Sequence, residues 1–161
     1  MSKTVAPTGT VRWIGLRPKR GQPMTVVDSA MATADTGLEG DHRSRRSGSG
    51  RQVTFFQAEH LRVVGELLDQ DPIDPSLTRR NVVVEGINLL ALRAGRFRIG
   101  EALFEGAGPC FPCTRMEENL GVGGLHAMYG HGGINARVLQ GGAIQIGAPV
   151  TFLGGEPPDE S

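Results

Sequence analysis

The chain has 161 residues, with 17 basic and 17 acidic side chains, 24 glycines, 10 prolines and two cysteines. A formal net charge of zero excludes the broad positive field that draws nucleic acid or an anionic membrane to a protein, and two cysteines do not make the disulfide framework of a small secreted scaffold. So much glycine and proline between apolar runs argues against a helical bundle and favours one domain of many short strands.

The N-terminal segment MSKTVAPTGTVRW lacks the apolar stretch and cleavage pattern of a signal peptide. No segment approaches the roughly 20 apolar residues that span a bilayer. We therefore expect a cytoplasmic protein that binds neither membranes nor nucleic acid. We expect a flexible N-terminus at residues 1–8, a single domain at 9–153 and a disordered tail at 154–161.

The first part of the chain predicts strands separated by polar loops. Residues 10–16 (TVRWIGL) and 24–31 (MTVVDSAM) have strand character, and the glycines of residues 36–41 (TGLEGD) indicate a turn. Residues 42–52 (HRSRRSGSGRQ) place four arginines among serines and glycines, which is typical of a flexible loop that is solvated unless a ligand orders it.

The rest of the chain predicts one clear helix and several more strands. Residues 57–68 (QAEHLRVVGELL) repeat apolar side chains with the helical period, directly after a short buried strand at 53–56. Further strands are indicated at residues 81–85, 96–99, 102–104, 134–139, 143–146 and 149–153. About eight short strands and one helix favour a mainly β fold, a closed or nearly closed β-barrel, over a sheet that alternates with helices.

The segment GPCFPC places Cys110 and Cys113 in a loop at the end of a predicted strand, where barrels commonly display functional residues. A thiolate is a soft metal ligand and a sulfur nucleophile, and Arg115 would favour the charged form of Cys113. Cys113 is therefore the first candidate for chemistry. The alternative, that both cysteines are small buried hydrophobic residues, fits a loop of glycines and prolines poorly.

A second interpretation comes from spacing, because Cys110, Cys113, His126 and His131 fit the zinc-finger expression C-x2-C-x12-H-x4-H. Glycines surround both histidines, so a finger helix is not expected, but a structural zinc site of another geometry stays open. A thioredoxin-like redox pair would require a preceding strand–helix–strand unit, which the sequence does not indicate.

Arginines are the remaining candidate ligands for an anion. Arg79 and Arg80 lie at the start of a predicted strand, and Arg43 and Arg51 lie in the loop; guanidinium groups bind phosphate and carboxylate through two-point contacts. Taken alone, Arg79 and Arg80 are equally compatible with an exposed strand end. No phosphate-binding glycine loop and no order of serine, histidine and aspartate typical of hydrolases is present.

Taken in order, these segments resemble the MOSC family, the C-terminal module of molybdenum-cofactor sulfurases. The resemblance spans residues 9–153. It rests on GLEGDH at 37–42, RQVT at 51–54, QAEH at 57–60, RRNV at 79–82, FRIGE at 97–101 and GPCFPC at 108–113.

The resemblance implies a β-barrel of the pyruvate-kinase-like type. It also implies that Cys113 takes the place of the cysteine that ligates molybdenum in amidoxime-reducing relatives and is proposed to handle sulfur in sulfurases. Arg79 and Asn81 match in type the residues that hold the phosphate and ring system of the pterin cofactor, whereas Arg80 stands where relatives can have proline. We expect Arg43, Arg51 and Arg115 to add positive charge to such a site.

Two departures from the family limit what the resemblance implies. The chain lacks the aminotransferase-like domain that carries pyridoxal phosphate in sulfurases, so no pyridoxal phosphate is expected here. It also lacks the N-terminal β-domain that completes the pterin site of the reductases.

The leading hypothesis is a protein that binds the molybdenum-pterin cofactor, or carries sulfur as a persulfide on Cys113, with a sulfurase or an electron-transfer protein as partner. As an enzyme, it would reduce an N-hydroxylated small molecule. The alternative is a non-enzymatic zinc-binding or interaction module that uses the four cysteine and histidine residues. The sequence leaves open the choice between enzyme and carrier, the oligomeric state, and whether the cysteines form a disulfide.

Overall fold

The computed structural model describes residues 7–19, 22–42, 49–112 and 114–155. Its strands are β1 (Thr8–Leu16), β2 (Thr25–Val27), β3 (Ser29–Thr33), β4 (Gly37–Leu38), β5 (Val53–Gln57), β6 (Val82–Glu85), β7 (Arg96–Ile99), β8 (Ala102–Pro109), β9 (Ile134–Gln140), β10 (Gly142–Gln145) and β11 (Pro149–Gly154). Its helices are α1 (Ala58–Leu67), α2 (Arg115–Leu120) and α3 (Gly124–Met128), with short 3-10 helices η2 (Pro75–Thr78) and η3 (Leu89–Leu92).

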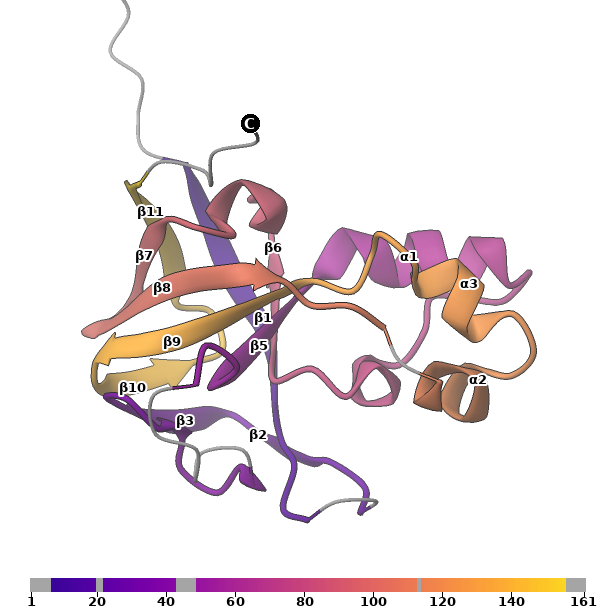
Figure 1. Cartoon of the computed structure of the whole chain (residues 1–161), viewed down its shortest axis with the longest axis horizontal. Helices are drawn as coiled ribbons and strands as arrows, with labels where there is room; N and C mark the ends of the chain where they lie inside the picture. The colour runs from indigo at the N-terminus through magenta and orange to yellow at the C-terminus, as the bar shows by residue number, and fades with distance from the viewer. Residues whose placement is uncertain (1–6, 20–21, 43–48, 113, 156–161) are drawn as a thin grey trace, which may run out of the picture.

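The main sheet closes on itself (Figure 1). Strands β11, β7, β8, β9, β5, β6 and β1 are neighbours in this order, and β1 pairs again with β11 to complete a seven-stranded barrel. Strand β2 extends the sheet beyond β1, and β10, β3 and β4 form a small second sheet. The prediction of a mainly β, closed barrel is confirmed.

Strand β1 closes the barrel because it reaches three partners along its length. Residues 8–10 pair with β11, residues 10–14 pair with β6, and residues 14–16 pair with β2. The register with β6 shifts between Val11 and Trp13, and an irregularity of this kind bends a strand and increases its twist. That bend lets a single strand leave one partner and join the next.

Apolar side chains fill the interior of the barrel. Its centre is a group of three phenylalanines, Phe55, Phe97 and Phe104, whose ring centroids lie 5.1 to 5.5 Å apart and whose side chains are fully buried. Edge-to-face and offset-stacked rings at these distances stabilise a core beyond the area they bury.

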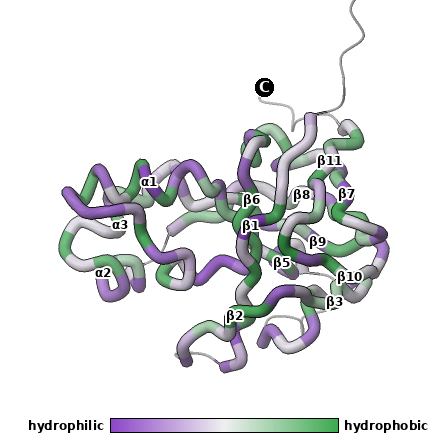
Figure 2. Tube along the Cα trace, turned by 180° about the vertical axis from the view of Figure 1, so that it is seen from behind, coloured by the Kyte–Doolittle hydropathy of each residue, from purple (hydrophilic) through white to green (hydrophobic). Residues whose placement is uncertain are grey.

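The helices cover one side of the barrel wall and form a second apolar cluster there (Figures 1 and 2). Successive residues of β5 and β6 therefore face opposite cores: Phe55 points into the barrel, whereas Phe56 and Val83 pack against Val64 of α1 and Met116 of α2. Burial on both faces explains why these strands read as continuous apolar runs in the sequence.

The structure departs from the sequence prediction in one connection. Strands β5 and β6 are parallel and α1 lies between them in the chain, so the barrel does contain the strand–helix–strand unit that we did not expect. A parallel pair needs such a crossover, and α1 supplies it while covering the outer face of both strands. No helix in the described part of the chain is long and apolar enough to cross a membrane.

Candidate functional site

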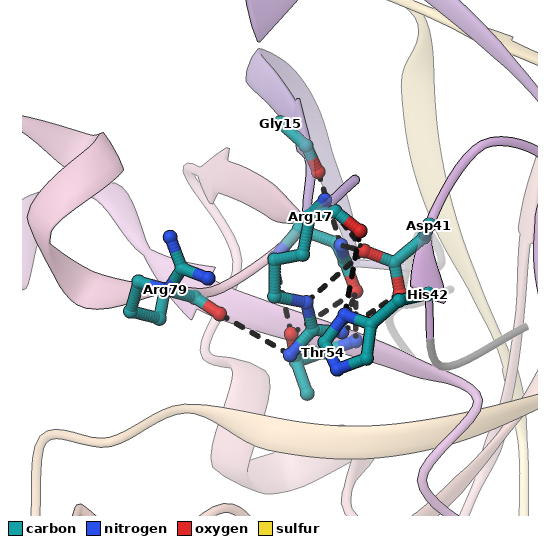
Figure 3. Close-up of polar contacts among 7 residues, drawn as sticks. Gly15, Arg17, Asp41, His42, Thr54 and Arg79 are labelled. Atoms are coloured by element: carbon teal, nitrogen blue, oxygen red, sulfur yellow. Dashed lines mark hydrogen bonds and ion pairs between the residues drawn. The ribbon is translucent and has the colours of Figure 1, made fainter. Parts of the chain in front are cut away.

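A buried cluster of polar side chains lies where β1 ends and where β5 and β6 begin (Figure 3). Its centre is an ion pair between Arg17 and Asp41, which are 4% and 2% exposed. Two atoms of the Arg17 guanidinium, Nε and Nη2, donate to the two carboxylate oxygens at 3.0 and 2.9 Å, and the Arg17 backbone N–H donates at 2.8 Å. A fully buried pair of this kind requires both partners, because either charge alone would be left in a medium of low polarity.

Burial raises the pKa of the Asp41 carboxyl, but hydrogen bonds and positive charge from Arg17, with a hydrogen bond from Asn81, outweigh it. The net effect holds the Asp41 pKa below its ordinary value, so the carboxylate is charged at neutral pH.

Asn81 ties the ion pair to the barrel wall. Its side-chain amide N–H groups donate to the Gly15 carbonyl at 3.0 Å and to Asp41 Oδ1 at 3.1 Å. Its carbonyl oxygen accepts from Arg17 Nη2 at 3.1 Å and from the backbone N–H and hydroxyl of Thr54 at 3.1 and 3.2 Å. These bonds use both amide protons, and Asn81 is 0% exposed. Asn81 is therefore enclosed in the protein and is not an exposed side chain at the strand end.

The cluster explains why GLEGDH and RRN occur together in the sequence, since Asp41 of the first motif is bonded to Asn81 of the second. Sequence reasoning missed Arg17 and Thr54. Arg17 follows directly after an apolar strand. Its position at the end of that strand is the sequence signal that could have identified it as a site residue.

Arg79 lies beside this cluster but is more exposed than Arg17 and Asp41, and it forms its own hydrogen bonds. Its backbone is in the left-handed region at φ 59°, which is strained for any residue other than glycine. Its carbonyl accepts from Arg17 Nη1 at 3.4 Å, and its own Nη1 donates to the Gln22 carbonyl at 2.6 Å. Among the described residues, no carboxylate forms an ion pair with the half-buried Arg79 side chain.

Three guanidinium groups share this region with one carboxylate. Burial lowers the pKa of Arg79, as do the positive charges of Arg17 and Arg115, and only Asp41 opposes them. Arg115 is the first residue of α2, two positions after Cys113. Like charges that perturb one another lie close together, so the chain has a local excess of positive charge despite its zero net charge.

Arg80 points the other way and binds the cysteine loop. Its side chain is buried, with Nε donating to the Gly132 carbonyl at 2.8 Å and Nη2 donating to the Phe111 carbonyl at 3.3 Å. The backbone N–H of Cys110 donates to the Gly133 carbonyl at 2.8 Å. Adjacent arginines thus connect two sites: Arg79 adds charge beside Asp41, and Arg80 holds the loop that carries the cysteines.

Close backbone contacts require the two glycines that follow His131. A Cβ atom on Gly132 would lie 2.0 Å from the Cys110 carbonyl oxygen, and one on Gly133 would lie 1.9 Å from the Phe55 carbonyl oxygen. Gly133 also has a positive φ of 84°. No other residue fits at these two positions unless the backbone moves. Backbone packing therefore explains why these residues are glycine, without a zinc finger.

The other predicted site residues are dispersed or lie outside the described part. Cys113 and Arg43 are outside it, as is most of the predicted loop at 42–52, while Arg51 is exposed. His126 is exposed at the end of α3, and His131 packs on His60. Among the described residues, which exclude Cys113, no three histidine, cysteine or acidic side chains are grouped to hold a metal ion.

His60 and His131 form an edge-to-face pair with ring centroids 4.6 Å apart, and the Nδ1 atom of each is buried without a hydrogen-bond partner. Burial lowers the pKa of His60, the charge of His131 lowers it further, and Glu59 only partly opposes them. The folded protein therefore holds His60 neutral at a pH where the unfolded chain already takes up a proton.

We expect the free energy of unfolding to fall as pH is lowered through about 6.5, by up to about 1 kcal/mol for this half-exposed group. Urea unfolding at several pH values measures the effect. His60→Gln should flatten this part of the profile, and the exposed-site control His126→Gln should leave it unchanged. An identical pH profile for His60→Gln and the unsubstituted protein would contradict the assignment.

The family model of the MOSC domain matches residues 42–151. The chain resembles the crystal structure of the YuaD protein from Bacillus subtilis, with a TM-score of 0.76 and 18% identity over 90% of this chain and 95% of that one. It also resembles YiiM from Geobacillus stearothermophilus, with a TM-score of 0.73 and 20% identity over 92% of this chain and 76% of that one. YiiM from Escherichia coli gives a TM-score of 0.67 and 23% identity over 91% and 71%. No curated protein matches the chain.

Proposed function

The chain belongs to the MOSC domain family, and from this we propose that it binds the molybdenum-pterin cofactor, or carries sulfur as a persulfide, at the loop of Cys113. The observation that supports this most is the position of the half-buried Arg79. Its carbonyl accepts from Arg17, it has no carboxylate partner among the described residues, and the positive charges of Arg17 and Arg115 lower its pKa. Such a group of guanidinium side chains suits a phosphate-bearing anion.

The described residues fit the anionic part of the cofactor. Arg17 is engaged by Asp41, so the charge available to a ligand is that of the half-buried Arg79 and Arg115. These two side chains would hold the phosphate, with Arg43 and Arg51 adding charge from the loop between β4 and β5. Asn81 would act indirectly, by fixing Arg17 and Asp41, since its own polar atoms are used within the cluster.

Cys113 supplies the reactive sulfur in either version. Arg115, two residues further along the chain, would favour its thiolate form, and Arg80 holds the preceding part of the loop through the Phe111 carbonyl. When bound, the cofactor would supply two-electron redox chemistry at molybdenum, suited to reduction of an N-hydroxylated compound.

In the carrier version, the Cys113 thiolate attacks the outer sulfur of a donor persulfide. Cys113 then bears the persulfide, and the donor leaves as a thiolate. A sulfurase would be the donor, and an electron-transfer protein would be the partner of the enzymatic version. Both versions of the function fit a cytoplasmic protein with reduced cysteines.

Arg79→Gly tests the anion site without unfolding the protein. Glycine relieves the left-handed backbone at φ 59°, so the melting temperature should not fall, while the main phosphate ligand is lost. We expect the dissociation constant for pyrophosphate, measured by calorimetry, to rise about tenfold, equivalent to about 1.4 kcal/mol.

Arg62→Ala is the matched control, because Arg62 is 77% exposed on α1 in a surface ion pair with Glu66. Its affinity for pyrophosphate should equal that of the unsubstituted protein. Equal affinities for Arg79→Gly and Arg62→Ala would refute the assignment of Arg79.

A further inference from the structure

An apolar pocket of about 220 Å³ lies beside the cysteine loop. One wall is the segment 109–112 and the other is the segment 129–133, with Leu90 of η3 at the edge. Arg80 holds the two walls together, because it donates to the Phe111 carbonyl on one side and to the Gly132 carbonyl on the other. The pocket is lined by Leu90, Pro109, Cys110, Phe111, Pro112, Tyr129, Gly130, Gly132 and Gly133.

The walls offer little to a charged ligand. No lining side chain among the described residues is charged. Several backbone groups are already bonded within the protein: the Cys110 N–H to the Gly133 carbonyl, and the Pro109 carbonyl to Asn135 Nδ2 at 3.2 Å. Pro109 and Pro112 have no N–H to donate. A ligand of this pocket is therefore held mainly by apolar contact.

The size of the pocket and the side chains at its rim favour a flat ring as the ligand. An apolar cavity of about 150 Å³ already admits benzene. The pocket is lined by two large aromatic side chains that are exposed to solvent, Phe111 (71% exposed) and Tyr129 (76% exposed). Aromatic faces at the rim of an apolar pocket stack favourably on a flat ring.

We propose that this pocket binds an uncharged aromatic ring of a small molecule. Because Cys110 lines the pocket, the ring is anchored next to the loop that carries the chemistry, and it belongs to the substrate; this last step rests on the proposed function. The site then has two parts, an apolar part for the ring and the separate charged part around Arg79 for the anion.

Titration with 4-fluorobenzamide, followed by fluorine NMR, tests the pocket directly. We expect saturable binding with a dissociation constant on the order of 1 mM, typical of a ligand with about ten heavy atoms. The charged analogue 4-fluorobenzoate should bind at least about tenfold more weakly, since a carboxylate in apolar surroundings is not compensated.

Leu90→Trp fills the edge of the pocket and should weaken binding of 4-fluorobenzamide about tenfold or more. Leu90 is 40% exposed, so the larger side chain need not disturb the core. The matched control is Leu67→Trp, at a residue 61% exposed on α1, which should bind as the unsubstituted protein does. No saturable binding, equal binding by Leu90→Trp, or tighter binding of the benzoate would each overturn the ring site.

Arg79→Gly separates the two assignments. We expect it to lose affinity for pyrophosphate and to keep full affinity for 4-fluorobenzamide. Ring binding without any anion binding would remove the cofactor version of the proposed function and leave the pocket intact as a ring site, whereas anion binding without ring binding would remove only the pocket.

Discussion

Cys113→Ser is expected to lower the molybdenum or persulfide sulfur recovered with the protein by more than about tenfold. Residues that only support a metal ligand commonly change affinity by about 10–100-fold, and Cys113 is the proposed ligand itself. A serine hydroxyl is neither a soft ligand nor able to hold sulfane sulfur. Elemental analysis measures the metal, and release of thiocyanate with cyanide measures the persulfide.

Cys110→Ser is the matched control for that change. Cys110 is half-buried in the pocket wall, with its backbone N–H bonded to the Gly133 carbonyl, so serine should preserve the loop and leave part of the bound molybdenum or sulfur in place. Equal and complete losses from the two variants would instead indicate a disulfide or a shared zinc site, and would contradict the role of Cys113.

Asp41→Ala is expected to lower the free energy of unfolding by about 3–5 kcal/mol, because it leaves the buried guanidinium of Arg17 without its partner. For a chain of this size, the melting temperature should fall by about 10 °C. The folded protein holds the Asp41 pKa below its ordinary value. The carboxylate therefore stabilises the fold above about pH 4 and loses that contribution as the pH falls through the folded pKa.

Two further variants identify the cause of this loss. Glu66→Ala removes one partner of an exposed ion pair on α1 and should change stability by less than about 1 kcal/mol. Replacing Arg17 and Asp41 together by methionine and leucine should recover part of the stability, since no buried charge is left unpaired. A loss below about 1 kcal/mol for Asp41→Ala would show that the pair does not hold this end of the barrel.

The closed barrel was predictable from its strands, but the strand pairings that close it were not. Short β-branched runs such as residues 82–84 mark the strands, and burial on both faces makes them apolar throughout. Closure depends on β1 pairing with β11, at residues more than a hundred positions apart, while the same strand pairs with β6 through a bulge that no local pattern specifies. The parallel pair β5 and β6 was missed because the same apolar runs suit either strand direction.

The candidate site was likewise predictable only in part. The cysteine loop and the arginines of RRN stand out by residue type, so the sequence identifies them. The different surroundings of these three neighbouring residues do not show in the sequence: Arg80 is buried against the loop, Arg79 is half-exposed, and Asn81 is wholly enclosed. Arg17 was missed because its importance comes from contacts with Asp41 and Asn81, 24 and 64 positions away.

Analysis of the unsubstituted protein, purified from a host that makes the cofactor, tests the central assignment most directly. Metal content, pterin fluorescence and cyanide-labile sulfur are measured on one sample. We predict either molybdenum with pterin fluorescence or persulfide sulfur, in each case approaching one equivalent per chain and lost in Cys113→Ser. One equivalent of zinc, with no molybdenum, no pterin and no labile sulfur, would contradict the assignment and favour a zinc-binding module.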